Sequence, residues 1–371
     1  MEEYEASSVR QRAKIEERDG KRAKANAQKA PKNGEKSLQI GWIVCFVLFT
    51  FAIGILLMYQ SRETPTNYQK EVNRECDEGT GQCIAIADYT RDSGKTWHRG
   101  IFYVNETTFD FEKMLEKKIG AEAILKCPAN AADAPEGCVP DHGRLSWPYV
   151  ATMAIMPFVV GTLHHPTQMQ QRTQSALVIG MGGGTLDMFL HRKTPSLNIT
   201  IYELDPMVVQ MARKWFGTVE DSTRRTFVED GIVGIEKAAE NGEQFDLVAL
   251  DACEMYIDLI CPASVFSDEK ILQKIKAILK PTGAFVVNIL MSDEKEEDKY
   301  VAEQKRKLLN IFPICLHTSF VGELAHVFVC LPTKINVSGE HAKLSKEWEK
   351  KREELTKEFG IDEHLTQYRI S

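Results

Sequence analysis

The sequence contains no Cys-x-x-Cys pair, so its nine cysteines do not form the usual zinc-binding pattern, and no metal site is expected. It also lacks an excess of positive charge: the net charge of −7 gives no general attraction to nucleic acid. Residues 1–37 have almost no large apolar side chains and cannot bury a core, which predicts a solvated cytosolic tail. A nucleic-acid-binding arm is the weaker alternative for this tail, because acidic residues are interspersed among its basic ones.

Residues 38–59 contain no charged side chain. A helix of this length reaches roughly 33 Å, which is enough to cross the hydrocarbon core of a bilayer. Ten Lys or Arg residues precede this segment, whereas only Arg62, Lys70 and Arg74 follow it closely. The positive-inside rule therefore predicts a single-pass type II membrane protein with a cytosolic N-terminus and its main domain in the secretory lumen or outside the cell. A cleavable signal peptide is the rival interpretation, but the segment is too long and too far from the N-terminus.

The eight cysteines outside that segment form four pairs of near neighbours, which favours disulfides over buried free thiols. The pairs are Cys76/Cys83, Cys127/Cys138, Cys253/Cys261 and Cys315/Cys330. Residues 314–319 and 326–331 are expected to form a symmetric hairpin, and such a hairpin places the last pair directly opposite each other. Three sequons, at Asn105, Asn198 and Asn336, permit glycosylation.

The segment Ser175–Asp187, SALVIGMGGGTLD, is typical of a buried strand, a glycine turn and the start of a helix. A dinucleotide fingerprint requires Gly-x-Gly-x-x-Gly, but Thr185 occupies the place of its third glycine. The spacing of Gly180, Gly182 and Gly184 is instead the Gly-x-Gly-x-Gly form common in S-adenosylmethionine (SAM) enzymes. This turn is the first candidate for cofactor binding.

Acidic residues follow the next three predicted strands. Glu203 ends the strand that begins at Asn198, Asp230 follows the strand 226–228, and Asp251 follows the strand 245–250. Glu203 lies 19 residues after Gly184 (203 − 184), about the distance at which an acidic residue meets a ribose. The carboxyl ends of parallel strands meet at one edge of a sheet, so this edge is the predicted ligand site.

The series IGMGGGTL, YELDPMVVQMARKWF, VEDG, FDLVALDA and LKPTGAFVV resembles class I SAM-dependent methyltransferases. Within that superfamily it is most similar to the spermidine synthase and methyltransferase-like branch, as is the upstream stretch Tyr149–Pro166. The resemblance implies that Gly180, Gly182 and Gly184 bind the methionine end of SAM. It also implies that Glu203 binds the ribose and Asp230 the adenine, and that Asp251 faces the transferred group. Asp251 and Glu254 are the catalytic candidates, because either carboxylate could orient an amine on the acceptor side and take its proton.

Two departures from the polyamine synthases bear on the reaction. The glycine turn lacks their aspartate, and their Asp-Ser-Ser-Asp-like loop is here Asp251-Ala252-Cys253-Glu254. A diamine substrate needs several carboxylates, so we expect a membrane-anchored methyltransferase with SAM as cofactor and an acceptor that the sequence does not identify. Aminopropyl transfer from decarboxylated SAM remains an alternative. A non-catalytic lumenal protein that retains the fold is another, since SAM is made in the cytosol.

The predicted fold is α/β, with a Rossmann-like seven-stranded methyltransferase sheet that is mostly parallel and closes with an antiparallel hairpin. A small N-terminal β-hairpin layer and one transmembrane helix precede it, and a homodimer is an open alternative. The expected parts are a tail (1–37), a membrane span (38–59), a linker (60–75), a cysteine-stapled β-rich appendage (76–147), the catalytic domain (148–335) and a helical C-terminal tail (336–371).

Overall fold

A computed structural model describes residues 69–77, 79, 81–91, 96–104, 119–128, 137–167, 173–254, 259–320, 323–334, 341–361 and 368–370. The apolar segment 38–59 lies outside these residues, as do the sequons at Asn105 and Asn336. Among the helices that the structure describes, none is long and apolar enough to cross a membrane.

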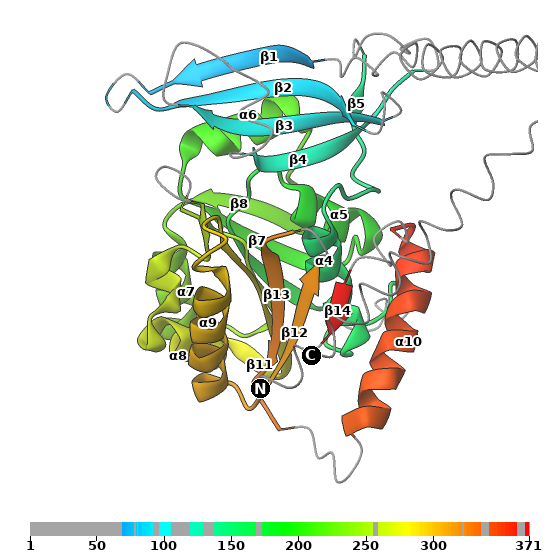
Figure 1. Ribbon diagram of the computed structural model, residues 1–371, viewed down its shortest axis with the longest axis vertical. Coiled ribbons are helices and arrows are strands. Elements are labelled where there is room, and N and C mark those ends of the chain that lie inside the picture. Colours follow the sequence, from blue (N-terminus) through cyan, green and yellow to red (C-terminus); the bar gives the residue numbers. More distant parts are fainter. Residues whose placement is uncertain are drawn as a thin grey trace, which may run out of the picture. The chain divides into compact units, whose positions relative to one another are not determined.

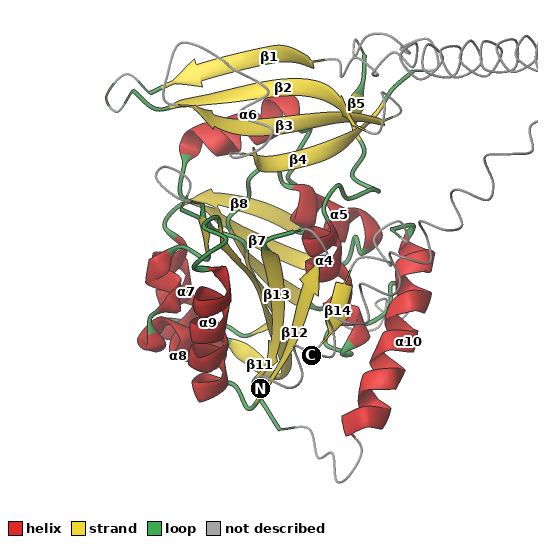
Figure 2. Cartoon of the chain, viewed as in Figure 1, coloured by secondary structure: helices red, strands yellow, loops and turns green. Residues whose placement is uncertain are grey.

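The main sheet is the framework of the site (Figures 1 and 2). Its strands follow the order β14-β12-β13-β11-β9-β6-β7-β8, and the short β10 pairs with β11. The neighbours from β11 to β8 are parallel, whereas β13, β12, β14 and β10 pair antiparallel. The strands are β6 Ser175–Ile179, β7 Asn198–Glu203, β8 Arg224–Val228, β9 Phe245–Leu250, β10 Ile260–Cys261, β11 Leu279–Met291, β12 Ile314–Phe320, β13 Ala325–Leu331 and β14 Tyr368–Ile370.

Both faces of this sheet are covered by helices, which is why its central strands are continuous apolar runs. Alternate residues of β11 enter two separate cores, with Val286 on one face and Phe285 and Val287 on the other. Helices α7 Gly231–Glu240, α8 Glu269–Ala277 and α9 Glu297–Ile311 cover the second face. Helices α4 Pro148–Val159, α5 Thr185–Lys193 and α10 His341–Phe359 cover the first.

The closing hairpin has the register that the cysteine spacing predicts. Cys315 of β12 lies opposite Cys330 of β13, and the two form a disulfide. The other three expected bridges, Cys76–Cys83, Cys127–Cys138 and Cys253–Cys261, are also present. The sheet is larger than the seven strands expected, because β10 and β14 add to it. Strand β14 belongs to the C-terminal tail, for which we expected a helix and no strand.

The N-terminal layer is a five-stranded antiparallel sheet and not the two-stranded hairpin that we expected. Its strands are β1 Gln69–Cys76, β2 Cys83–Arg91, β3 Thr96–Val104, β4 Ile119–Lys126 and β5 Val139–Pro140, in sequential order. Ile84, Ile86 and Ile101 pack on helix α6 Pro206–Trp215, which lies between the two sheets (Figure 1). Arg99 of β3 also donates from Nη1 to the Trp215 carbonyl at the end of α6, at 2.8 Å.

Candidate functional site

The carboxyl ends of β6, β7 and β9 meet at one place, as the parallel topology requires. The Gly180 amide donates to the Tyr202 carbonyl, and the Asp251 amide donates to the Ile179 carbonyl, both at 2.9 Å. Gly180 has a φ of +85°, and a Cβ on it would lie 2.5 Å from the Asp251 carbonyl oxygen. Only glycine therefore lets the end of β6 lie against the residue that follows β9.

Position 182 requires glycine for a different reason, which the sequence did not indicate. A Cβ on Gly182 would lie 3.0 Å from the Ala121 Cβ of strand β4. Its missing side chain thus makes room for the N-terminal sheet, whereas we expected that room to belong to the nucleoside. Strand β4 consequently lies directly against the glycine turn and forms part of the wall of the candidate site.

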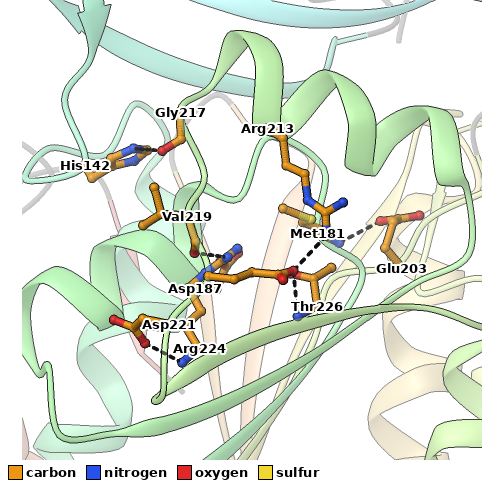
Figure 3. Close-up of polar contacts among 11 residues, drawn as sticks. His142, Met181, Asp187, Glu203, Arg213, Gly217, Val219, Asp221, Arg224 and Thr226 are labelled. Carbon is orange, nitrogen blue, oxygen red and sulfur yellow. Dashed lines mark hydrogen bonds and ion pairs between the residues drawn. The ribbon is translucent and has the colours of Figure 1, made fainter.

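Glu203 lies at the end of β7 and binds the glycine turn (Figure 3). Its Oε2 accepts from the Met181 amide at 2.8 Å, and its Oε1 accepts from the Asp205 amide at 3.0 Å. Burial raises the pKa of this carboxyl, while hydrogen bonds from the amides of Asp205, Met181 and Gly182 oppose the rise. The structure therefore brings Glu203 and the turn together and gives Glu203 a structural task beside the expected ribose contact.

The carboxylate of Asp251 is held by side chains from two other elements. Its Oδ1 accepts from Asn288 Nδ2 of β11 at 2.9 Å, and its carboxylate also accepts from the Tyr149 hydroxyl of α4. Burial raises the pKa of Asp251, and these two donors lower it in part. Burial, followed by the charge of Asp251, raises the pKa of Tyr149 well above its ordinary value, so the hydroxyl stays a donor.

Sequence reasoning missed Tyr149 and Asn288 as parts of the site. Both carried a detectable signal, because each is a polar side chain inside an apolar element. Tyr149 follows Pro148 in the apolar helix PYVATMAIMPFV, and Asn288 interrupts the buried strand segment AFVVNILM. A polar group in such a position needs a hydrogen-bond partner, and here the partner is Asp251.

The remaining predicted residues are placed less centrally. Asp230 is exposed and caps helix α7, accepting from the Ile232 amide at 2.8 Å. Glu254 is exposed as well, and its Oε1 accepts from the Ser264 amide at 2.7 Å and the Ser264 hydroxyl at 2.6 Å. These hydrogen bonds lower the pKa of Glu254. The Glu254 carboxylate is thus engaged with Ser264, and the structure does not join it to Asp251 as a catalytic pair.

The residues at this edge fit the nucleoside that the glycine turn implies. Carboxylates at Glu203 and Asp251 accept hydrogen bonds from hydroxyl and amine groups and favour a nearby positive charge. Leu204 and Val228, which follow or end adjacent strands, are 71% and 52% exposed and offer apolar surface for a planar base. In the part of the chain that the structure describes, no group of three or more His, Cys, Asp or Glu could hold a metal ion.

Comparisons with known proteins agree with this geometry. Residues 161–331 match the family model described as the spermine/spermidine synthase domain. The eEF1A lysine and N-terminal methyltransferase of Homo sapiens is 26% identical over 281 residues, which cover 70% of this chain and 38% of that protein. The chain therefore spans little more than a third of the length of this relative.

Two further proteins are similar to parts of this chain. A polyamine aminopropyltransferase of Vibrio vulnificus is 29% identical over 150 residues, covering 40% of this chain and 45% of that protein. The crystal structure of human methyltransferase-like protein 13 in complex with SAH is 25% identical, with a TM-score of 0.46, and covers 54% of this chain and 91% of that one. The resemblance to class I SAM-dependent methyltransferases near the spermidine synthase branch is confirmed, and the methyltransferase relatives agree with a transferase that uses SAM.

The predicted location is corrected by the same comparisons. We expected a type II membrane protein with a lumenal or extracellular domain, but relatives that match 70% of the chain are methyltransferases of eEF1A. The error has a physical origin: hydropathy and charge bias around residues 38–59 decided the prediction, and neither carries information about the domain that follows.

Proposed function

We propose that this chain is a SAM-dependent methyltransferase that acts on an amine of a protein substrate. Asp251 is the observation that carries the proposal: its carboxylate is held by Tyr149 and Asn288 directly beside the glycine turn. SAM, when bound, supplies a methyl group on a positively charged sulfur. The glycine turn and Glu203 would hold this cofactor, and Asp230 would contact its base.

The acceptor side follows from the chemistry of Asp251. An amine reacts only without its extra proton, and a carboxylate beside it can orient the nitrogen and take up that proton. Positioning of the two reactants is the other requirement. The human relative is named for methylation of lysine and of the N-terminus of eEF1A, and both are amines. We therefore propose eEF1A as the first acceptor to test.

The aminopropyl alternative has one supporting observation, the similarity to a polyamine aminopropyltransferase over 40% of the chain. Against it, the exposed Glu254 is bonded to Ser264, so the structure does not pair this carboxylate with Asp251 for the binding of a diamine. Parallel titrations with SAM and decarboxylated SAM separate the two reactions, since a clear preference for the decarboxylated form would favour aminopropyl transfer.

Binding of SAM to the purified chain, measured by calorimetry, tests the proposal most directly. We expect Glu203→Ala to weaken this binding by about ten- to a hundredfold, because a charge-assisted hydrogen bond is lost and the glycine turn loses its acceptor. Asp205→Ala is the matched control. It removes the cap of α6, at a cost of about 1 kcal/mol in stability, without touching the turn, and it should keep the affinity for SAM. Equal affinities of wild type and Glu203→Ala would contradict the assignment of Glu203.

The pH dependence of methyl transfer to eEF1A provides a second test. Activity needs ionised Asp251, so it should fall toward acid with a midpoint above the ordinary aspartate range, because burial raises the pKa of this group. Tyr149→Phe removes a donor that lowers this pKa, so the midpoint should move to higher pH. Tyr202→Phe, a tyrosine that stacks on Phe227 instead, should leave the profile in place. An unmoved profile in Tyr149→Phe would mean that Asp251 does not control the rate.

A further inference from the structure

The side-chain amide of Asn288 has a hydrogen-bond partner for its nitrogen and none, among the described residues, for its oxygen. Asn288 is 2% exposed, and its Nδ2 donates to Asp251 Oδ1 at 2.9 Å. The amide must face this way, because its carbonyl oxygen and the carboxylate are both acceptors and would repel each other. Asn288 Oδ1 is then left buried without a hydrogen-bond partner among the described residues.

An unpaired buried carbonyl is costly to a fold, so one beside a candidate catalytic group calls for an explanation. Asn288 lies on the same face of β11 as Val286, in the core that α4 covers and next to Asp251 and Tyr149. Asp251 and Asn288 together offer acceptor oxygens, and one of the two N–H groups of Asn288 Nδ2 is given to Asp251. A ligand group that satisfies both residues at once must carry two donors, and a primary amine carries two N–H groups.

We propose that Asn288 Oδ1 accepts one N–H of the substrate amine while Asp251 accepts the other, and that Asn288 thereby limits transfer to a single methyl group. The inference rests on the proposed function. The two hydrogen bonds point the nitrogen lone pair away from both oxygens and toward the methyl group. That lone pair forms the new N–C bond, the bond between the methyl carbon and sulfur breaks with its electrons staying on sulfur, and the extra proton on nitrogen passes to Asp251.

A second transfer is disfavoured by the same two oxygens. After one methylation the neutral amine has one N–H, one new methyl group, its original carbon substituent and its lone pair. Aiming that lone pair again at a methyl donor would place the new methyl group against Asn288 Oδ1 or Asp251. One buried acceptor would then stay unpaired, and this penalty discriminates against the secondary amine.

The test uses n-butylamine, N-methylbutylamine and N,N-dimethylbutylamine as probes, titrated calorimetrically into the full chain with S-adenosylhomocysteine present. Wild type should bind the primary and the secondary amine, whose protonated forms carry at least two N–H groups, about tenfold more tightly than the tertiary one, whose single N–H leaves one buried acceptor unpaired. Asn288→Leu keeps a similar volume but has no polar atom, and its affinities for the secondary and the tertiary amine should differ by less than about twofold. With methylation of n-butylamine followed by mass spectrometry, wild type should stop at one methyl group and the variant should add a second.

Val286→Ala is the matched control, because it disturbs the same face of β11 without changing a polar group, and it should keep the wild-type preference. A wild-type protein that binds the three amines equally would overturn the inference, and this series needs no variant to fold. An unchanged preference in Asn288→Leu would overturn it as well. Binding of SAM without binding of any amine would reject the role of Asn288 and leave the cofactor assignment standing. Failure to bind SAM would reject the proposed function and, with it, the role of Asn288 in methyl transfer.

Discussion

Asp251→Asn should lower methyl transfer by about 10²–10⁴-fold at about pH 8, the usual contribution of a positioned general base. The variant keeps the size of the side chain and can still bond to Asn288 and Tyr149, but it cannot take up a proton from the amine. Steady-state rates with eEF1A as acceptor measure the loss, and SAM binding should be retained. A variant with more than about a tenth of the wild-type rate would show that Asp251 is not the base.

The same substitution should not destabilise the domain at about pH 8, because the folded state raises the pKa of Asp251. A group with a raised pKa stabilises the fold when it is protonated, below its unfolded pKa of about 3.9, and this contribution is lost as the pH rises through the folded value. At alkaline pH the ionised Asp251 therefore lowers the free energy of unfolding, and its replacement by Asn removes this destabilisation. Thermal unfolding of both proteins should show equal or higher stability for the variant, with the difference shrinking toward acid.

A control for this result lies at the other end of β9. Asp246 accepts from the Ser175 amide at 2.8 Å and forms an ion pair with Lys280 at 2.7 Å. Asp246→Asn should cost stability and leave the chemistry unaffected, because Asp246 sits far along the strand from the carboxyl edge. Asp246→Asn should therefore lower stability and keep the rate, whereas Asp251→Asn should keep stability and lower the rate. A loss of stability in both variants would contradict the conclusion that ionised Asp251 destabilises the fold.

Arg224→Met should lower the free energy of unfolding by about 3–5 kcal/mol, the largest stability effect we expect. Arg224 of β8 is fully buried, and its Nε donates to Asp187 Oδ2 of α5 at 2.6 Å while Nη1 donates to the Val219 carbonyl at 2.6 Å (Figure 3). Burial raises the pKa of Asp187, and Arg224 opposes that rise. Removal of Arg224 leaves a buried carboxylate without its counter-charge.

The double substitution Arg224→Met with Asp187→Leu separates charge from packing. It removes both buried charges, so it should recover most of the lost stability, as replacement of buried ion pairs by apolar side chains often does. Chemical denaturation at two pH values measures this, and the single variant should regain stability toward acid because Asp187 then becomes protonated. If the double variant is as unstable as the single one, Arg224 stabilises the fold through its packing and not through its charge.

Much of the fold could be predicted because local chemistry and global structure agree. The apolar runs at 175–179 and 245–250 have no polar face, so they can only be central strands covered on both sides. The mostly parallel sheet and its closing antiparallel hairpin then follow from the alternation of strands and helices and from the resemblance. The predicted pairing of Cys315 with Cys330 needed only the symmetry of a hairpin, which is a purely local property.

Other features depended on groups distant in the chain. Tyr149, Asp251 and Asn288 are about 100 and 37 positions apart and meet only because α4 covers the strands β9 and β11. The engagement of Glu254 with Ser264 could not be foreseen either, since a loop carboxylate bonds whichever donor the folded chain brings near. Strand β14 was missed for a similar reason: a three-residue strand has no period of its own and exists through its pairing with β12.

The sequence by itself determined the α/β class, the glycine turn, the acidic residues at the strand ends and the four cysteine pairs, because each depends on residue type and short spacing. Only the tertiary structure decided which of those acids is supported for chemistry, what fills the space beside Gly182 and where the N-terminal sheet lies. These are decided by burial and by hydrogen-bond geometry between separate elements. Both quantities arise only once the chain has packed, and no pattern within a single segment encodes them.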